Sequence, residues 1–159
     1  TRSRARNMPR YGHRSRRESQ LNVKVWLARL LIGIVFFFNL QCAIAFLLSP
    51  ESFLSAYELS GAVGAAVIRG FGVLFLMWNV PYAVALWHPV RFRTSLWQAV
   101  AMQALGVVGE LLIYGSLPSD HRYLRQAIVR FAAFDGIGLL LLMMAVLLRN
   151  GSRKLSSYK

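Results

Sequence analysis

The chain has 159 residues, of which 56% are hydrophobic, and a formal net charge of +13 from 19 basic and 6 acidic residues. A mean hydropathy of +0.44 excludes an intrinsically disordered chain, and the short length excludes a large soluble catalytic domain beside several membrane spans. The single cysteine, Cys42, excludes an internal disulfide and a multi-cysteine metal site.

Residues 1–23 form a basic arm in which seven arginines are opposed only by Glu18. Such an arm fits two partners, which are nucleic acid and the anionic lipid of a membrane surface. Because a long apolar segment follows immediately, we favour anionic lipid over nucleic acid, with each basic side chain near the surface contributing about 1 kcal/mol. Docking of the arm to a partner protein stays open.

The first predicted membrane span covers residues 25–48. It is too long for the apolar region of a signal peptide, which has about 7–15 residues, and long enough to cross a bilayer as a helix. Asn39 and Gln41 lie within it, and we expect both to face a neighbouring helix because polar amides in hydrocarbon hydrogen-bond across helices. The connection that follows, residues 49–60, is acidic and has no basic residue.

The second predicted span covers residues 61–87. Small residues recur at every fourth position, at Ala62, Ala66 and Gly70, and this spacing predicts a packing seam for another helix. Arg69 lies beside that seam. Since a guanidinium in the membrane interior costs from about 3 to more than 10 kcal/mol, Arg69 needs an anionic partner elsewhere in the chain.

The third and fourth predicted spans cover residues 95–114 and 126–148, and a basic tail of residues 149–159 follows. No histidine lies within a span, so a haem held by two histidines has no ligands. The chain also lacks an H-E-x-x-H motif, a C-x-x-C motif and a glycine-rich phosphate loop. We therefore expect no metal site, and an accessory protein rather than an enzyme acting alone.

Lysine and arginine concentrate in three places: the N-terminal arm, the loop between the second and third spans, and the C-terminal tail. Basic residues are retained on the cytoplasmic side of a membrane. Together with the four spans, this distribution predicts an all-α protein. It is an integral membrane four-helix bundle formed by residues 24–148, with both termini in the cytoplasm.

The charged and polar residues within the spans form a candidate cluster. At 1.5 Å per residue, three of them fall about 13 Å from the outer helix ends and two about 6 Å. Matched depths predict that Arg69 pairs with Asp135 and that Arg130 pairs with Glu110, because buried charges need partners. The cluster either only fixes helix register or forms an outward-facing pocket for a quinone head group, a small anion or a proton. Its members are Asn39, Arg69, Gln103, Glu110, Arg130 and Asp135.

Four spans, with the sequence Arg69-Gly70-Phe71-Gly72 in the second followed by an apolar run, resemble the DoxX-like superfamily of small bacterial membrane proteins. The resemblance implies a four-helix bundle in the bacterial plasma membrane. It also implies, as for some members, association with quinone-linked sulfur oxidation or redox-stress complexes. We expect an accessory subunit that packs with other membrane proteins, for example in an electron-transfer assembly. The alternative is a small quinone-linked redox component or a transporter.

Overall fold

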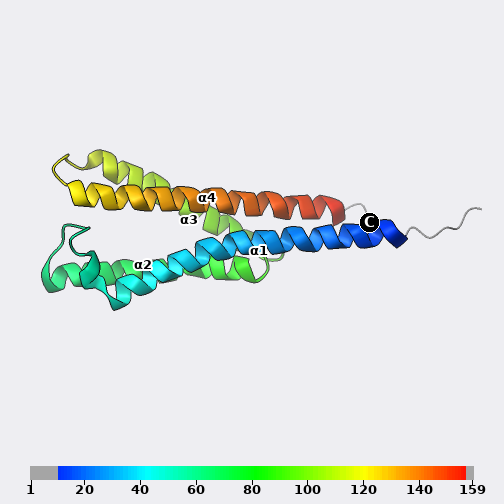
Figure 1. Ribbon diagram of the computed structural model, residues 1–159, viewed down its shortest axis with the longest axis horizontal. Helices are drawn as coiled ribbons and strands as arrows, with labels where there is room; N and C mark the ends of the chain where they lie inside the picture. Colours follow the sequence, from blue (N-terminus) through cyan, green and yellow to red (C-terminus); the bar gives the residue numbers. More distant parts are fainter. Residues whose placement is uncertain (1–10, 157–159) are drawn as a thin grey trace, which may run out of the picture.

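The computed structural model describes the backbone of residues 11–156 and the side chains of residues 19–150, and this part of the chain contains helices and no strands. Four long helices are joined by loops, one of which carries a short 3-10 helix (Figure 1). The elements are α1 (Tyr11–Leu48), η1 (Pro50–Phe53), α2 (Gly61–Trp87), α3 (Arg93–Ser116) and α4 (Arg122–Ser156).

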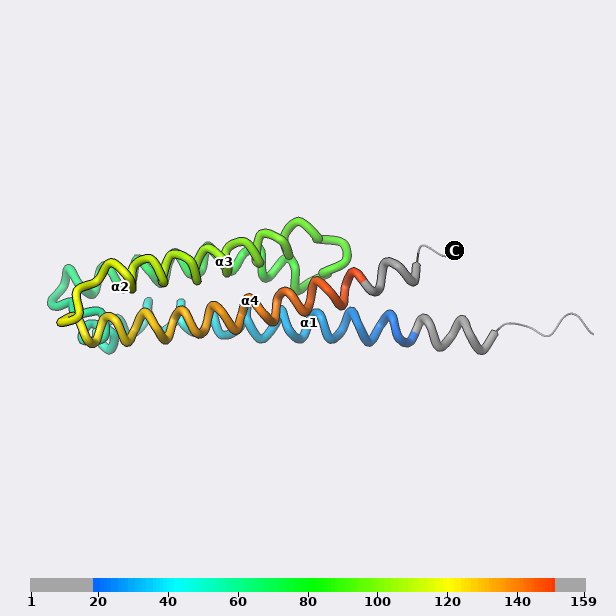
Figure 2. Tube along the Cα trace, turned by 90° about the horizontal axis from the view of Figure 1, so that it is seen from above, coloured from blue at the N-terminus to red at the C-terminus, as the bar shows by residue number. Residues whose placement is uncertain are grey.

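The four long helices form an antiparallel bundle. Each packs most closely against two others, in the cyclic order α1, α2, α3, α4. Across one diagonal the rings of Phe75 on α2 and Phe131 on α4 meet, with their centroids 6.1 Å apart. The connection of residues 49–60 and the α3–α4 loop lie at one end, which we call the loop end (Figures 1 and 2). The α2–α3 loop lies at the opposite end, which we call the terminal end. The predicted all-α four-helix bundle is confirmed.

All four helices are long and apolar enough to cross a membrane. Their outer surfaces are rich in large apolar side chains, including Trp26, Phe37, Leu105 and Leu140, each more than half exposed. A contiguous apolar exterior of this kind suits contact with lipid. The chain is therefore a multi-pass membrane protein. The spans are Ser19–Leu48, Gly61–Trp87, Arg93–Ser116 and Arg122–Asn150.

The bundle core changes character along its length. In its main apolar cluster each helix contributes one fully buried alanine, and so little side-chain bulk lets the backbones approach closely. Toward the loop end aromatic rings fill the interior around Phe46, which is 1% exposed. Its ring centroid lies 4.7 Å from that of Phe53 and about 6 Å from those of Tyr57, Phe75 and Phe131. The alanines are Ala28, Ala85, Ala99 and Ala145.

The small-residue seam predicted on α2 does not pack within the bundle. Ala62 and Gly70 are exposed, and a methyl group at Gly70 would meet no heavy atom within 4 Å. The inward face of α2 lies two residues further along the chain, at Gly64 and Gly72. A methyl group at Gly72 would lie 3.0 Å from the Ala43 carbonyl oxygen of α1. The close α1–α2 approach therefore uses a different strip of small residues from the predicted one.

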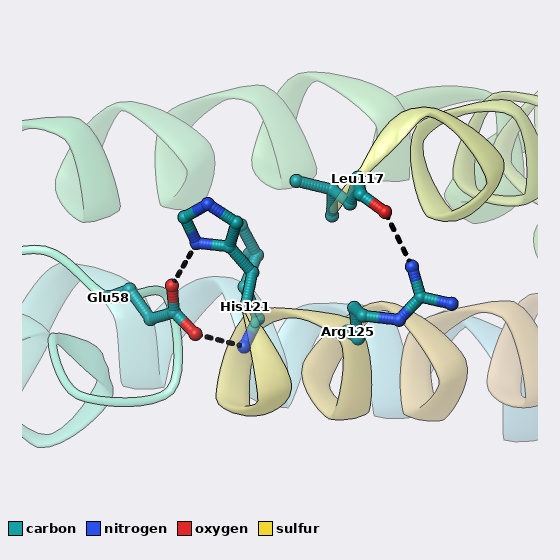
Figure 3. A network of polar contacts seen from close by, with 5 residues as sticks. Glu58, Leu117, His121 and Arg125 are labelled. Atoms are coloured by element: carbon teal, nitrogen blue, oxygen red, sulfur yellow. Dashed lines mark hydrogen bonds and ion pairs between the residues drawn. The ribbon is translucent and has the colours of Figure 1, made fainter. Parts of the chain in front are cut away.

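Arginines of one helix cap the carboxyl ends of its neighbours. Arg29 of α1 donates from Nε to the Leu86 carbonyl oxygen at the end of α2, at 3.1 Å. Arg125 of α4 donates to the Leu117 carbonyl oxygen at the end of α3, at 2.6 Å (Figure 3). It also donates to the Tyr114 carbonyl oxygen, at 3.2 Å. Cations at helix carboxyl ends are favoured because the last carbonyls are unpaired and the helix dipole is negative there.

Glu58 joins the connection to the start of α4. The connection ends in a Schellman motif, in which Leu59 donates to the Leu54 carbonyl oxygen at 2.9 Å and Glu58 donates to that of Ser55 at 3.2 Å. Glu58 has a φ of 54°, in the left-handed region where glycine is usual. A glutamate there costs about 1–2 kcal/mol, but its carboxylate reaches the first turn of α4.

The Glu58 carboxylate makes two contacts with that turn. Oε2 lies 2.5 Å from Nδ1 of His121, and Oε1 accepts the Leu124 backbone N–H at 3.2 Å (Figure 3). The hydrogen bond from His121 lowers the pKa of Glu58 below its usual 4.5. The hydrogen bond to Glu58 raises the pKa of His121 above its usual 6.5. A carboxylate at a helix N-terminus is favoured by the unpaired N–H groups there.

The His121→Gln variant is expected to lower the thermal midpoint most between about pH 4.5 and 6.5, where both partners are charged. Because the pKa of His121 is raised in the folded state, its contribution is complete below pH 6.5 and is lost as pH rises through the raised value. Because the pKa of Glu58 is lowered, its contribution is complete above pH 4.5 and is lost as pH falls through the lowered value. Thermal scans from pH 3 to 9 measure the difference, which is expected to be small because the pair is exposed.

His88→Gln is the control for this experiment, since Nδ1 of His88 accepts a backbone N–H and His88 forms no ion pair within the described part of the chain. A difference between the wild-type protein and His121→Gln that stays constant across the whole pH range would show that the imidazole contributes by packing and not by charge.

Candidate functional site

Three polar side chains from three helices form a continuous hydrogen-bonded network inside the bundle. Tyr82 of α2 donates its hydroxyl hydrogen to Oε1 of Gln103 on α3, with the oxygens 2.5 Å apart. The Nε2 of Gln103 then donates to Oδ1 of Asp135 on α4, at 2.7 Å. All three residues are buried, with exposed fractions of 2%, 3% and 7%. The phenol fixes the orientation of the amide, and the amide holds the carboxyl group.

Two glycines make room for this network. A methyl group at Gly106 of α3 would collide with Oδ2 of Asp135, and one at Gly138 of α4 would lie 2.7 Å from Nε2 of Gln103. Each polar side chain therefore lies against a glycine of the opposite helix. The same spacing occurs on both antiparallel helices, because a glycine follows Gln103 by three positions and also follows Asp135 by three positions. We call Gln103, Asp135 and the two glycines the reciprocal pair.

Asn39 and Glu110 lie nearer the loop end. Asn39 is buried on α1, 6% exposed, as predicted. Glu110 lies two helical turns from Gln103 on the same face of α3. Its Oε2 atom is buried and has no hydrogen-bond partner among the described residues. The site thus holds two carboxyl groups, and neither forms an ion pair with a basic side chain in the described part of the chain.

The predicted pair of Arg69 and Asp135 is wrong. Arg69 donates from Nη2 to Oε1 of Glu51 in the connection, at 3.2 Å, and its side chain is 50% exposed. The error comes from the depth count. Because α4 begins at Arg122 and not at residue 126, Asp135 lies about 20 Å from the loop end of its helix, whereas Arg69 lies about 12 Å from that of α2.

The predicted pair of Arg130 and Glu110 is also wrong, since no ion pair joins them in the described structure. Arg130 precedes Asp135 by five positions, which places it about 140° around the helix. With Asp135 facing the interior, Arg130 faces outward and is exposed. Gln41, which was predicted to face a neighbouring helix, is exposed as well. Among the six candidate residues, only Gln103 and Asp135 form a hydrogen bond with each other.

Sequence reasoning missed three members of the network, which are Tyr82 and the two glycines of the reciprocal pair. The repeated spacing of a polar residue and a glycine three positions later was a usable signal for the glycines. For Tyr82 the sequence offered no comparable signal, because a tyrosine near the end of a span is usual at the membrane interface. Its burial depends on how α2 packs against α3.

The network can hold and orient a carboxyl group in a low-dielectric interior. A buried carboxyl group without a basic partner is stabilised by a bound proton or by a polar ligand with donor groups. The described residues include no group of three or more potential metal ligands close together. Comparison with protein-family models, curated proteins and solved structures finds no match for this chain.

Proposed function

We propose that the chain is an accessory subunit of a larger membrane assembly, in which α2 packs against a helix of another membrane protein. The observation that supports this function is the outward strip of Ala62, Ala66 and Gly70, which the bundle leaves uncovered. In lipid, where apolar burial gives no driving force, helices associate where small residues allow close backbone contact. The strip offers such a surface along about two turns of α2.

The position of this strip on α2 strengthens the proposal. Gly64 and Gly72 face inward, and the strip lies two positions away, or about 200° around the helix, on the opposite side. The internal packing of α2 therefore does not account for the outward small residues. As part of the proposal, the chain lies in the plasma membrane of a bacterium with both termini in the cytoplasm, as a DoxX-like protein would. Its N-terminal arm rests on anionic lipid.

The Gly70→Leu variant is expected to lose its partner while the bundle itself stays folded, because leucine blocks close helix contact and Gly70 touches nothing within the bundle. The yield of co-purified partner in mild detergent should fall about tenfold or more, which corresponds to about 1.4 kcal/mol of binding free energy. Val80→Leu is the matched control, since Val80 is 61% exposed on the same helix, already bulky, and lies beyond the strip and about 80° around the helix from Gly70.

The purification also separates this proposal from its alternative. A wild-type chain without partners, or a Gly70→Leu variant with an undiminished yield of partner, would contradict the subunit role. The alternative is a quinone-linked redox component or a transporter that uses the buried polar site. It is favoured by Asp135 and Glu110, two carboxyl groups without a basic partner among the described residues, which suit a proton or a hydrogen-bonding quinone head group better than a small anion. It predicts a purified chain that carries quinone and no partner.

A further inference from the structure

A groove of about 400 Å³ opens on the outer surface between α1, α4 and the connection of residues 49–60. Aromatic rings form its walls, with Phe38 of α1 and Phe134 of α4 in edge-to-face contact at 6.1 Å between centroids. Phe131 forms part of the lining and also packs into the aromatic cluster around Phe46. The groove is thus an apolar surface groove whose aromatic walls pack against the bundle interior. We call it the Arg130 groove.

Arg130 of α4 and Gln41 of α1 bring polar groups into this apolar lining. Both are exposed, at about 12 Å and about 10 Å from the loop ends of their helices. Arg130 forms no ion pair or hydrogen bond with another described residue. A guanidinium at this depth in lipid is costly without an anion, so the position requires a partner from outside the described chain.

Arg69 shows how the protein treats an arginine at the same depth when it supplies the anion itself. Arg69 also lies about 12 Å from the loop end of its helix, and Glu51 of the connection pairs with it. No acidic side chain plays this part for Arg130 among the described residues. Of these two arginines at the same depth, Arg69 therefore has an acidic partner among the described residues and Arg130 has none. Arg130 is the one that lines an apolar groove.

We propose that the Arg130 groove binds one anionic phospholipid, with the lipid phosphate on the guanidinium and an acyl chain along Phe38 and Phe134. Arginine suits this partner because its planar fork matches two phosphate oxygens. An anionic lipid fits better than a zwitterionic one, whose own ammonium group already neutralises the phosphate. The amide of Gln41 is placed to donate to an ester carbonyl of the same lipid. This inference does not depend on the subunit role.

Tyr57 supplies a further donor on the connection side of the groove. Burial raises the pKa of Tyr57, so its phenol keeps the hydrogen that it would donate to a glycerol or phosphate oxygen. The groove thereby offers a cation for the lipid phosphate, neutral donors for the glycerol and ester oxygens, and aromatic walls for an acyl chain.

Native mass spectrometry of the full chain in detergent tests the proposal, with phosphatidylglycerol and phosphatidylcholine added separately at high salt. The salt screens the exposed charges of the N-terminal arm, and a pair inside the groove is screened much less. The wild-type protein should retain one phosphatidylglycerol in preference to phosphatidylcholine. Arg130→Gln should weaken that binding about tenfold or more, by loss of a charge-assisted hydrogen bond. Arg130→Lys should keep most of it.

Arg69→Gln is the matched control, because it removes the same charge from an exposed arginine at the same depth whose partner is Glu51. It should bind phosphatidylglycerol as the wild-type protein does. Equal retention by Arg130→Gln and wild type, or equal binding of the two lipids by wild type, would overturn the proposal. So would retention of a quinone in place of the phospholipid.

Photoactivatable phosphatidylglycerol locates the site without any variant that must fold. Cross-links should map by mass spectrometry to the peptides that contain Phe38 and Phe134. Cross-links confined to the N-terminal arm would show that lipid binds there and not in the groove, which would also overturn the proposal.

Discussion

The Gly106→Ala variant is expected to destabilise the bundle by about 2–4 kcal/mol, the sum of an overpacking cost and a weakened hydrogen bond to Asp135. The added methyl group would occupy the position of Oδ2 of Asp135. The carboxyl group cannot move far, because Gln103 holds its other oxygen at 2.7 Å and α4 packs directly against α3. The helices must separate or the network must break. Unfolding of the purified protein in mixed micelles measures the change.

Gly109→Ala is the matched control on the same helix. A methyl group at Gly109 meets no heavy atom within 4 Å. Alanine is favoured over glycine inside a helix by about 0.5–1 kcal/mol, so this variant should be as stable as wild type or slightly more stable. On α4, Gly138→Ala and Gly136→Ala repeat the comparison. Gly138→Ala should also destabilise the bundle, because its methyl group would lie 2.7 Å from Nε2 of Gln103, whose amide is held by Tyr82 and Asp135. Equal effects of Gly106→Ala and Gly109→Ala would contradict the close approach.

The helices themselves could be predicted because their signals are local. Apolar runs of sufficient length lie between polar loops, and the structure confirms four helices and the burial of Asn39, Gln103 and Asp135. The contacts between helices could not be predicted equally well. Both faces of α2 carry small residues at four- or eight-residue spacing, so composition alone does not decide which face is inward.

The two ion pairs predicted within the spans were wrong for a more specific reason. A depth count requires the exact start of each helix, and α4 begins four positions before the predicted span, which shifts Asp135 by about 6 Å. Depth along the helix also says nothing about which side of the helix a residue lies on. Arg130 and Asp135 lie about 140° apart on one helix, so the burial of Asp135 already placed Arg130 outside. Glu51 was available to Arg69 in the connection, but only the folded position of η1 brings the two together.

Gln103 and Asp135 are expected to be energetically coupled, because they are hydrogen-bonded to each other inside the bundle. Gln103→Leu or Asp135→Leu alone is expected to cost about 3 kcal/mol, because each leaves a buried polar group without its partner. The double leucine variant should cost well under the sum of the two. The coupling free energy should be about 2 kcal/mol, since both polar groups are then replaced by apolar ones of similar size. Unfolding free energies of the four proteins in one micelle composition give this value directly.

The same experiment with Arg69→Gln in place of Gln103→Leu is the matched control. Arg69 pairs with Glu51 and has no hydrogen bond to Asp135, so its effect and that of Asp135→Leu should add within about 0.5 kcal/mol. Tyr82→Phe should weaken the coupling without abolishing it, because the phenol only orients the Gln103 amide. Additive losses for Gln103 and Asp135 would show that α3 and α4 pack in a different register, because only the present register places each polar side chain against the glycine of the other helix. Strong coupling between Arg69 and Asp135 would show that these two side chains meet, against the pairing of Arg69 with Glu51.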